Sequence, residues 1–255
     1  MSSPRRDATR IGIAITVLVA LAGVIALAYI LFVRSPAPPA VGLGSPSPGS
    51  SAAAPSVGAL PSGATSSLDP ADLSGTWTID PSIGSFSDFS SSFVGYRVDE
   101  TLAGNEANTA VGRTPDVSGT LVLDGTSITS VDVTANLTAL RSDDDRRDGQ
   151  LRRQALETDA FPQATFRLTS PIELDAEPGD GETISTTAAG ELTLHGVTNV
   201  VEIPIEARLS GDVVTVAGSI DIVFADYVIA QPTSFLVLSI EDHGTMELQL
   251  HFRRG

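Results

Sequence analysis

From residue 72 to the C-terminus the sequence alternates apolar and polar residues in short runs, and this feature constrains the fold more than any other. In one run, Val201, Ile203 and Ile205 alternate with Glu202 and Pro204. Successive side chains of a strand point to opposite faces, so this pattern predicts antiparallel strands with one apolar face. The pattern recurs at 94–98, 131–137, 165–169, 191–195, 201–209, 220–224 and 246–252.

Turn residues separate these runs. Asp124-Gly125, Asp180-Gly181 and Ser210-Gly211-Asp212 each lie between two of them. Such dipeptides favour the tight turns of hairpins. Seven or more strands in one domain indicate an all-β sandwich or a closed barrel, and a barrel of about eight strands can enclose one ligand.

Residues 143–158 break the alternation. The segment is dense in charge, and Leu151, Ala155 and Leu156 stand at helical spacing. It therefore predicts a short surface helix, after which Phe161 packs onto the domain. Its charges favour a solvated helix face, and the alternative is a cap over one end of the barrel.

The N-terminus carries a second constraint. Residues 11–33 contain no charge, and their length of 23 residues matches a hydrocarbon core. They predict one transmembrane helix; a cleaved signal peptide is the alternative, but its apolar region is usually shorter. Arg5, Arg6 and Arg10 precede the segment and only Arg34 follows it, so the N-terminus is expected inside and the large domain outside.

The domain organisation follows from these segments. We expect a cytoplasmic N-terminus at 1–10, the transmembrane helix at 11–33, and a β-domain at 72–255. Residues 34–71 are rich in Pro, Ala, Ser and Gly and predict a disordered tether. The predicted protein is a single-pass protein of the cytoplasmic membrane, with its β-domain on the extracytoplasmic side.

Charge and composition exclude several functions. The net charge is −16, which repels nucleic acid, and all basic residues are arginine. There is no cysteine, and His195, His243 and His251 lack the spacing of metal ligands. The chain has no G-x-S-x-G motif either. We therefore expect no catalytic residues, no metal and no cofactor; the sequence does not indicate an oligomeric state.

Three motifs resemble the YceI-like family. They are Trp77-Thr78-Ile79-Asp80, then Arg147-Asp148-x-x-Leu151 followed by Phe161-Pro162-x-Ala164-Thr165-Phe166, and Gly190-Glu191-Leu192-Thr193-Leu194-His195-Gly196-Val197-Thr198. They occur in the family's order, and the third is the most specific. The resemblance implies an extended, lipocalin-like antiparallel barrel that holds a polyisoprenoid, a fatty acid or a related lipid. The chain departs from the family pattern after Asp80, where it reads Pro81-Ser82 in place of His-Ser.

The apolar faces of the strands are the candidate ligand-binding surface. Alternation alone leaves two possibilities, a filled interior and an elongated cavity, and the resemblance favours the cavity. The candidate interior residues are Val94, Tyr96, Val98, Leu121, Leu123, Val133, Phe166, Leu168, Leu192, Leu194, Ile203, Ile220, Ile222, Phe224, Leu248 and Leu250.

Polar residues near a barrel mouth could bind a headgroup. Arg97 and Arg113 are the candidates, because an arginine can pair a phosphate bidentately. His195 is expected to hydrogen-bond a turn and not to do chemistry. The leading hypothesis is thus a membrane-tethered, non-enzymatic lipid-binding protein, and the alternative is a ligand-free interaction or envelope-stress module with a filled barrel.

Overall fold

The computed structural model describes residues 37–43, 73–103, 105–232 and 237–255. The predicted cytoplasmic N-terminus at 1–10 and the predicted transmembrane helix at 11–33 lie outside these residues, as does most of the predicted tether at 34–71. Within the described residues, no helix has both the length and the apolar character that crossing a membrane requires. Contacts group Pro39–Gly255 as one compact unit, which contains all of the described strands.

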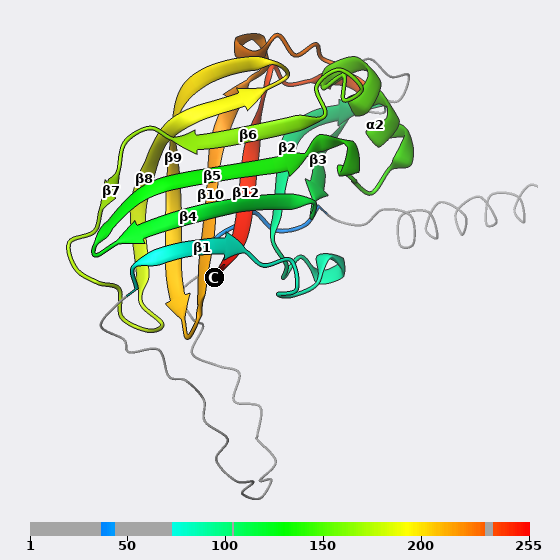
Figure 1. The fold of residues 1–255 in the computed structure, drawn as a ribbon. Coiled ribbons are helices and arrows are strands. Elements are labelled where there is room, and N and C mark those ends of the chain that lie inside the picture. The colour runs from blue at the N-terminus through cyan, green and yellow to red at the C-terminus, as the bar shows by residue number, and fades with distance from the viewer. Residues whose placement is uncertain (1–36, 44–72, 104, 233–236) are drawn as a thin grey trace, which may run out of the picture. The chain divides into compact units, whose positions relative to one another are not determined.

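The unit is built almost entirely of antiparallel strands, and one short α-helix is described, which confirms the all-β prediction (Figure 1). The strands are β1 (Gly75–Ile79), β2 (Phe93–Leu102), β3 (Glu106–Thr114), β4 (Val117–Asp124), β5 (Ser127–Asn136), β6 (Gln163–Leu168), β7 (Ile172–Glu173), β8 (Thr183–Leu194), β9 (Val197–Ser210), β10 (Val213–Val223), β11 (Val237–Ile240) and β12 (His243–Arg254). The helical elements are α2 (Asp145–Gln150), a π-helical turn (Leu151–Ala155), and the 3-10 turns η1 (Phe86–Asp88), η2 (Leu137–Ala139) and η4 (Phe224–Tyr227).

Eight strands close into a barrel in the order β1-β4-β5-β6-β8-β9-β10-β12, and β12 pairs back to β1. In Figure 1, β1, β4, β5 and β6 form one wall, and β8, β9, β10 and β12 cross behind them at a steep angle. Strands β2, β3 and β11 extend the sheet from β12. Closure removes most exposed strand edges, as the sequence led us to expect of a barrel.

In β12, alternate side chains point to the inside and to the outside of the barrel. Leu248, Leu250 and Phe252 point into the barrel, where they join the main apolar core. Glu247 and His251, from the intervening positions, are also buried, but on the outer face. A loop that includes η1 covers them there: the His251 Nε2 atom lies 2.9 Å from the Ser90 carbonyl oxygen. At Glu247 and His251 the outer wall of β12 is therefore polar but not solvated, whereas His243 and Arg253 near its ends are exposed.

The charged segment forms the predicted helix and also covers one end of the barrel. Asp144 caps α2 by accepting hydrogen bonds from the backbone N–H groups of Arg146 and Arg147. Leu156, which follows the π-helical turn, packs with Leu137 and Leu140 in a buried apolar cluster. The helical segment therefore acts as a cap, the second of the two alternatives that the sequence left open.

The glycine of the third motif, Gly190, lies where β6 and β8 come close together. A Cβ atom at this position would lie 2.4 Å from the Arg167 carbonyl oxygen and 2.4 Å from the Phe166 ring. Gly190→Ala should therefore lower the free energy of unfolding by at least about 1–3 kcal/mol, the usual cost of overpacking. Chemical denaturation measures this. Gly179→Ala is the control, because its Cβ would meet only the flexible Glu182 side chain; equal stability of the two variants would contradict the packing of β6 on β8.

Candidate functional site: an apolar cavity inside the barrel

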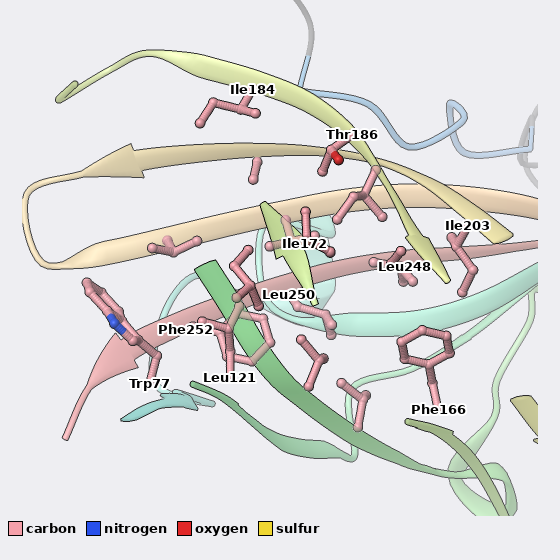
Figure 2. Close-up of a pocket in the computed structure, with 18 of the residues that line it drawn as sticks. Trp77, Leu121, Phe166, Ile172, Ile184, Thr186, Ile203, Leu248, Leu250 and Phe252 are labelled. Carbon is pink, nitrogen blue, oxygen red and sulfur yellow. The ribbon is translucent and has the colours of Figure 1, made fainter. Parts of the chain in front are cut away.

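The barrel encloses a cavity of about 140 Å³ (Figure 2). Apolar side chains from all eight barrel strands line it. The polar residues in its wall, within the described part of the chain, are Thr165, Thr186 and Arg208. Such a lining excludes water and offers few hydrogen bonds, so the cavity suits a hydrocarbon chain better than a polar metabolite.

Buried side chains close the first end of the barrel. Trp77 and Phe252 are each 1% exposed there, and the Trp77 indole donates a hydrogen bond of 3.1 Å to the Leu73 carbonyl oxygen. Both rings lie at the same end of the cavity in Figure 2. The loop between β7 and β8 is tied to the same end, because the Gly181 N–H donates to the Leu209 carbonyl oxygen at 2.7 Å.

The other end is closed by two apolar clusters. One contains Leu137, Leu140 and Leu156 beneath the helical cap. The second contains Leu192 and the ring of Tyr227 from η4. Burial raises the pKa of the Tyr227 phenol, and it also raises the pKa of Tyr96, which packs against the first cluster. Both phenols therefore stay neutral at physiological pH.

The structure places nine of the sixteen candidate interior residues in the cavity wall. These nine are Val94, Leu121, Leu123, Val133, Phe166, Leu192, Ile203, Leu248 and Leu250. The other seven do not line it: Tyr96 and Leu194 pack in the clusters under the cap, Ile220 and Ile222 pack around Tyr227, and Val98, Leu168 and Phe224 are half-buried elsewhere.

Several lining residues were not among the candidates. They include the aromatic pair Trp77 and Phe252, and β8 residues Ile184, Thr186 and Ala188. Phe252 continues the alternation of its strand, so the pattern could have indicated it. Apart from Ile184, residues 183–189 are small or hydroxylated and show no clear alternation, so the inward face of this stretch had no signal in the sequence.

The two candidate headgroup arginines do not line the cavity. Arg113 is 3% exposed and lies against the outer wall of β12, where its Nε donates to the Glu247 carboxylate at 2.7 Å. Its guanidinium carbon also lies 4.4 and 4.3 Å from the ring centroids of Phe89 and Phe93. The Arg97 side chain lies 3.8 Å from the same carboxylate. Both arginines are therefore part of a buried charge cluster, away from the cavity wall.

The described residues of the predicted tether hydrogen-bond to the barrel's outer surface. Arg113 donates to the Pro39 carbonyl oxygen at 3.0 Å. The Leu43 N–H donates to the Glu206 carboxylate at 2.9 Å, and Arg208 donates to the Leu43 carbonyl oxygen at 2.8 Å. Residues 39–43 thus form a strap between β3 and β9, a contact that their uncharged sequence did not predict.

His195 lies in the tight turn between β8 and β9, whereas the alternation placed it at the end of the strand. His195 and Gly196 both have positive φ, of 52° and 75°, which is the backbone of a type I′ turn. The His195 Nδ1 and Nε2 atoms each lie 3.0 Å from an acceptor, the Tyr227 carbonyl oxygen and the Glu157 carboxylate. The imidazole therefore ties the turn to η4 and to the helical cap.

His195→Asn should destabilise the domain by about 1–3 kcal/mol, even though asparagine is well suited to the turn, because both ring hydrogen bonds are lost. Thermal or chemical unfolding measures the change. Glu157→Gln, which keeps an oxygen acceptor, is the matched control and should cost less. A stable His195→Asn variant would show that the ring only fills the turn.

One surface group in the described part of the chain has metal-ligand chemistry. Glu241, Asp242 and His243 are all exposed, and their potential ligand atoms lie within 4.8 Å of one another. The Asp242 carboxylate raises the pKa of the His243 imidazole through their hydrogen bond. The group lies outside the cavity wall and does not contribute to this site.

Comparison with known proteins agrees with this architecture. The sequence model of the YceI-like domain family matches residues 77–252 of this chain. A polyisoprenoid binding domain from Saccharophagus degradans superposes with a TM-score of 0.52 at 21% identity, over 64% of this chain and 94% of that one. BcnA of Burkholderia cenocepacia superposes with a TM-score of 0.47 at 16% identity, over 62% of this chain and 95% of that one. A Campylobacter jejuni YceI protein superposes with a TM-score of 0.47 at 18% identity, over 56% of this chain and 84% of that one.

A search of curated proteins finds no match. The likenesses to solved structures concern the fold alone at these identities. The family model, in contrast, covers more than half of the chain and spans β1 to β12. Together with the closed barrel and its apolar interior, this match shows that the chain belongs to the YceI-like family.

Proposed function

We propose that this protein binds a long apolar ligand, such as a polyisoprenoid, a fatty acid or a related lipid, inside its barrel. The observation that carries the proposal is the cavity, whose wall is almost wholly hydrocarbon. Each methylene group that such a wall removes from water contributes about 0.8 kcal/mol before ordering costs. A chain of modest length therefore gains enough to bind without a strong polar contact.

The comparison supports the same class of ligand. The Saccharophagus degradans structure is described as a polyisoprenoid binding domain, and the YceI-like fold is a binding-protein fold. The cavity wall also argues for binding without turnover. The polar residues that line it, in the described part of the chain, are two threonines and Arg208, and the Arg208 guanidinium is hydrogen-bonded to Thr183 and Leu43 on the outer surface. This set lacks a nucleophile paired with a base.

The proposal includes the membrane. The apolar segment at 11–33 is the proposed anchor, and Arg5, Arg6 and Arg10 before it favour an inside N-terminus. The barrel would then be held on the extracytoplasmic side, where a carrier can take an apolar molecule from the bilayer surface. This topology rests on the sequence.

Native mass spectrometry of the barrel domain, prepared without detergent, tests the binding function. After incubation with geranylgeraniol or stearic acid, we expect a complex with one bound ligand. Ala188→Phe, which puts a ring into the cavity wall, should reduce the bound fraction while the circular dichroism spectrum stays that of a β-protein. A spectrum with no complex for either ligand would exclude the proposed function and leave the alternative of a ligand-free module.

A further inference from the structure

The barrel closes at both ends but not along its whole side. Strand β8 pairs with β6 only from Gly190 to Thr193, and the last contact between them is the hydrogen bond from the Thr169 N–H to the Ala189 carbonyl oxygen. Beyond that point the pairing of the chain with β8 ends. Residues Thr183–Ala188 of β8 pair with β9 alone, and β7 pairs with β5 alone. No strand pairing in the described residues joins β7 to β8.

The chain bends away where this gap begins. The register against β5 shifts by one residue between β6 and β7. Asp132 of β5 faces Arg167, and Ser127, five residues earlier in β5, faces Glu173, which is six residues after Arg167. Pro171 lies in the connection and has no N–H to donate to a ladder. We call the gap between β7 and residues Thr183–Ala188 of β8 the seam.

Cavity residues lie on both sides of the seam. Ile172 comes from β7 and Leu174 from the residue after it, while Ile184 and Thr186 come from β8. Figure 2 shows Ile172 on its short strand and Ile184 and Thr186 on the neighbouring long strand, all beside the cavity. Leu174, Ile184 and Thr186 are partly exposed, whereas Trp77 and Phe252 at the closed end are not. The side wall is thus the thinnest part of the enclosure.

The cavity is too small for a long chain unless its wall moves. A cavity of about 150 Å³ in another protein holds a benzene molecule, so a cavity of about 140 Å³ has room for about six carbon atoms. A longer chain needs the wall to move. Separating two paired strands would break a ladder of backbone hydrogen bonds, whereas widening the seam breaks only side-chain contacts.

We propose that the seam between β7 and β8 is the portal through which the apolar ligand enters and leaves the barrel, and that it widens to hold a long chain. The ligand slides in sideways between Ile172 and Ile184, so its chain never passes the closed ends. This inference rests on the proposed function.

Covalent closure of the seam tests it, and the absence of native cysteine makes the chemistry selective. In the register of β6 and β8, Glu173 would face Ser185, and both side chains are exposed on the outer face. The variant Glu173→Cys with Ser185→Cys is linked by a short bis-maleimide. The control variant, Arg167→Cys with Glu191→Cys, is linked in the same way, because these residues already face each other in the β6–β8 ladder.

The readout is the rate at which dansyl-labelled undecanoic acid gains fluorescence on uptake. Linking the seam should slow uptake on the order of tenfold or more, and linking the control pair should leave the rate near that of the unlinked protein. Linking after loading should slow release to a similar degree. Equal rates in all linked and unlinked forms would overturn the portal but not the binding function. No uptake by the unlinked protein would overturn both.

Discussion

Replacing Glu247 by glutamine should lower the free energy of unfolding by about 3–5 kcal/mol, one of the two largest effects expected in this domain. Glu247 is 1% exposed, and its Oε1 atom accepts a hydrogen bond of 2.7 Å from Arg113. Arg97 lies 3.8 Å from the other carboxylate oxygen. The amide keeps the shape but removes the carboxylate charge that pairs with Arg113, so the buried Arg113 guanidinium loses its counter-charge.

The surroundings of Arg113 make the loss hard to absorb. Phe89 and Phe93 hold its guanidinium plane, and Pro39 of the strap accepts another of its hydrogen bonds. The charge therefore cannot swing into water without opening the loop around η1 and the strap. We expect the strap to detach in the same variant, which hydrogen exchange at residues 39–43 would report as faster exchange.

Chemical denaturation of Glu247→Gln measures the effect. The double variant Glu247→Met with Arg113→Met is the control, because it replaces the pair by apolar groups of similar length and should recover much of the stability. An unchanged free energy of unfolding for Glu247→Gln would mean that the carboxylate is solvated and the cluster is not buried.

Phe166→Arg should destabilise the domain by more than about 3 kcal/mol, because it puts an unpaired charge into an apolar cavity. Phe166 lies in the cavity wall at the end opposite Trp77 and packs over Gly190 (Figure 2). A guanidinium at this position would meet the apolar cavity wall, in which the described residues offer no carboxylate.

The neighbouring residue offers a control on the same strand. The Arg167 side chain is 73% exposed and pairs with Asp132 at the surface, so Arg167→Ala should cost no more than about 1 kcal/mol. Thermal unfolding of the two variants compares the two faces of β6 directly. A Phe166→Arg variant as stable as Arg167→Ala would show that the inward and outward positions are reversed.

Where the sequence alternates clearly, as in β2, β9 and β12, it was sufficient to predict the strand and its inward face, because alternation reports which side of a strand is apolar. It could not predict the depth of a residue along the barrel. Tyr96 and Leu194 have the inward phase of Val94 and Leu192, yet they lie under the cap and not beside the cavity. Depth depends on strand register, which is set by partners far away in the sequence.

The prediction that Arg97 and Arg113 bind a headgroup at the barrel mouth was wrong for related reasons. Arg97 follows the inward-facing Tyr96, so alternation already places it on the outer face, and the barrel-mouth prediction for it ignored this phase. Arg113 follows Gly112 in a stretch without alternation, and its partner Glu247 lies 134 residues further on. The strap is a contact of the same kind, because Leu43 meets Arg208 across 165 residues.

The single tryptophan provides the most direct test that the barrel interior binds a chain. Trp77 lines the cavity, and no other tryptophan contributes to the emission. Titration with brominated stearic acid should quench this fluorescence in a saturable way, while stearic acid itself should not quench it, because bromine quenches only at close range. Emission that stays unchanged at concentrations where native mass spectrometry detects a bound ligand would contradict binding inside the barrel.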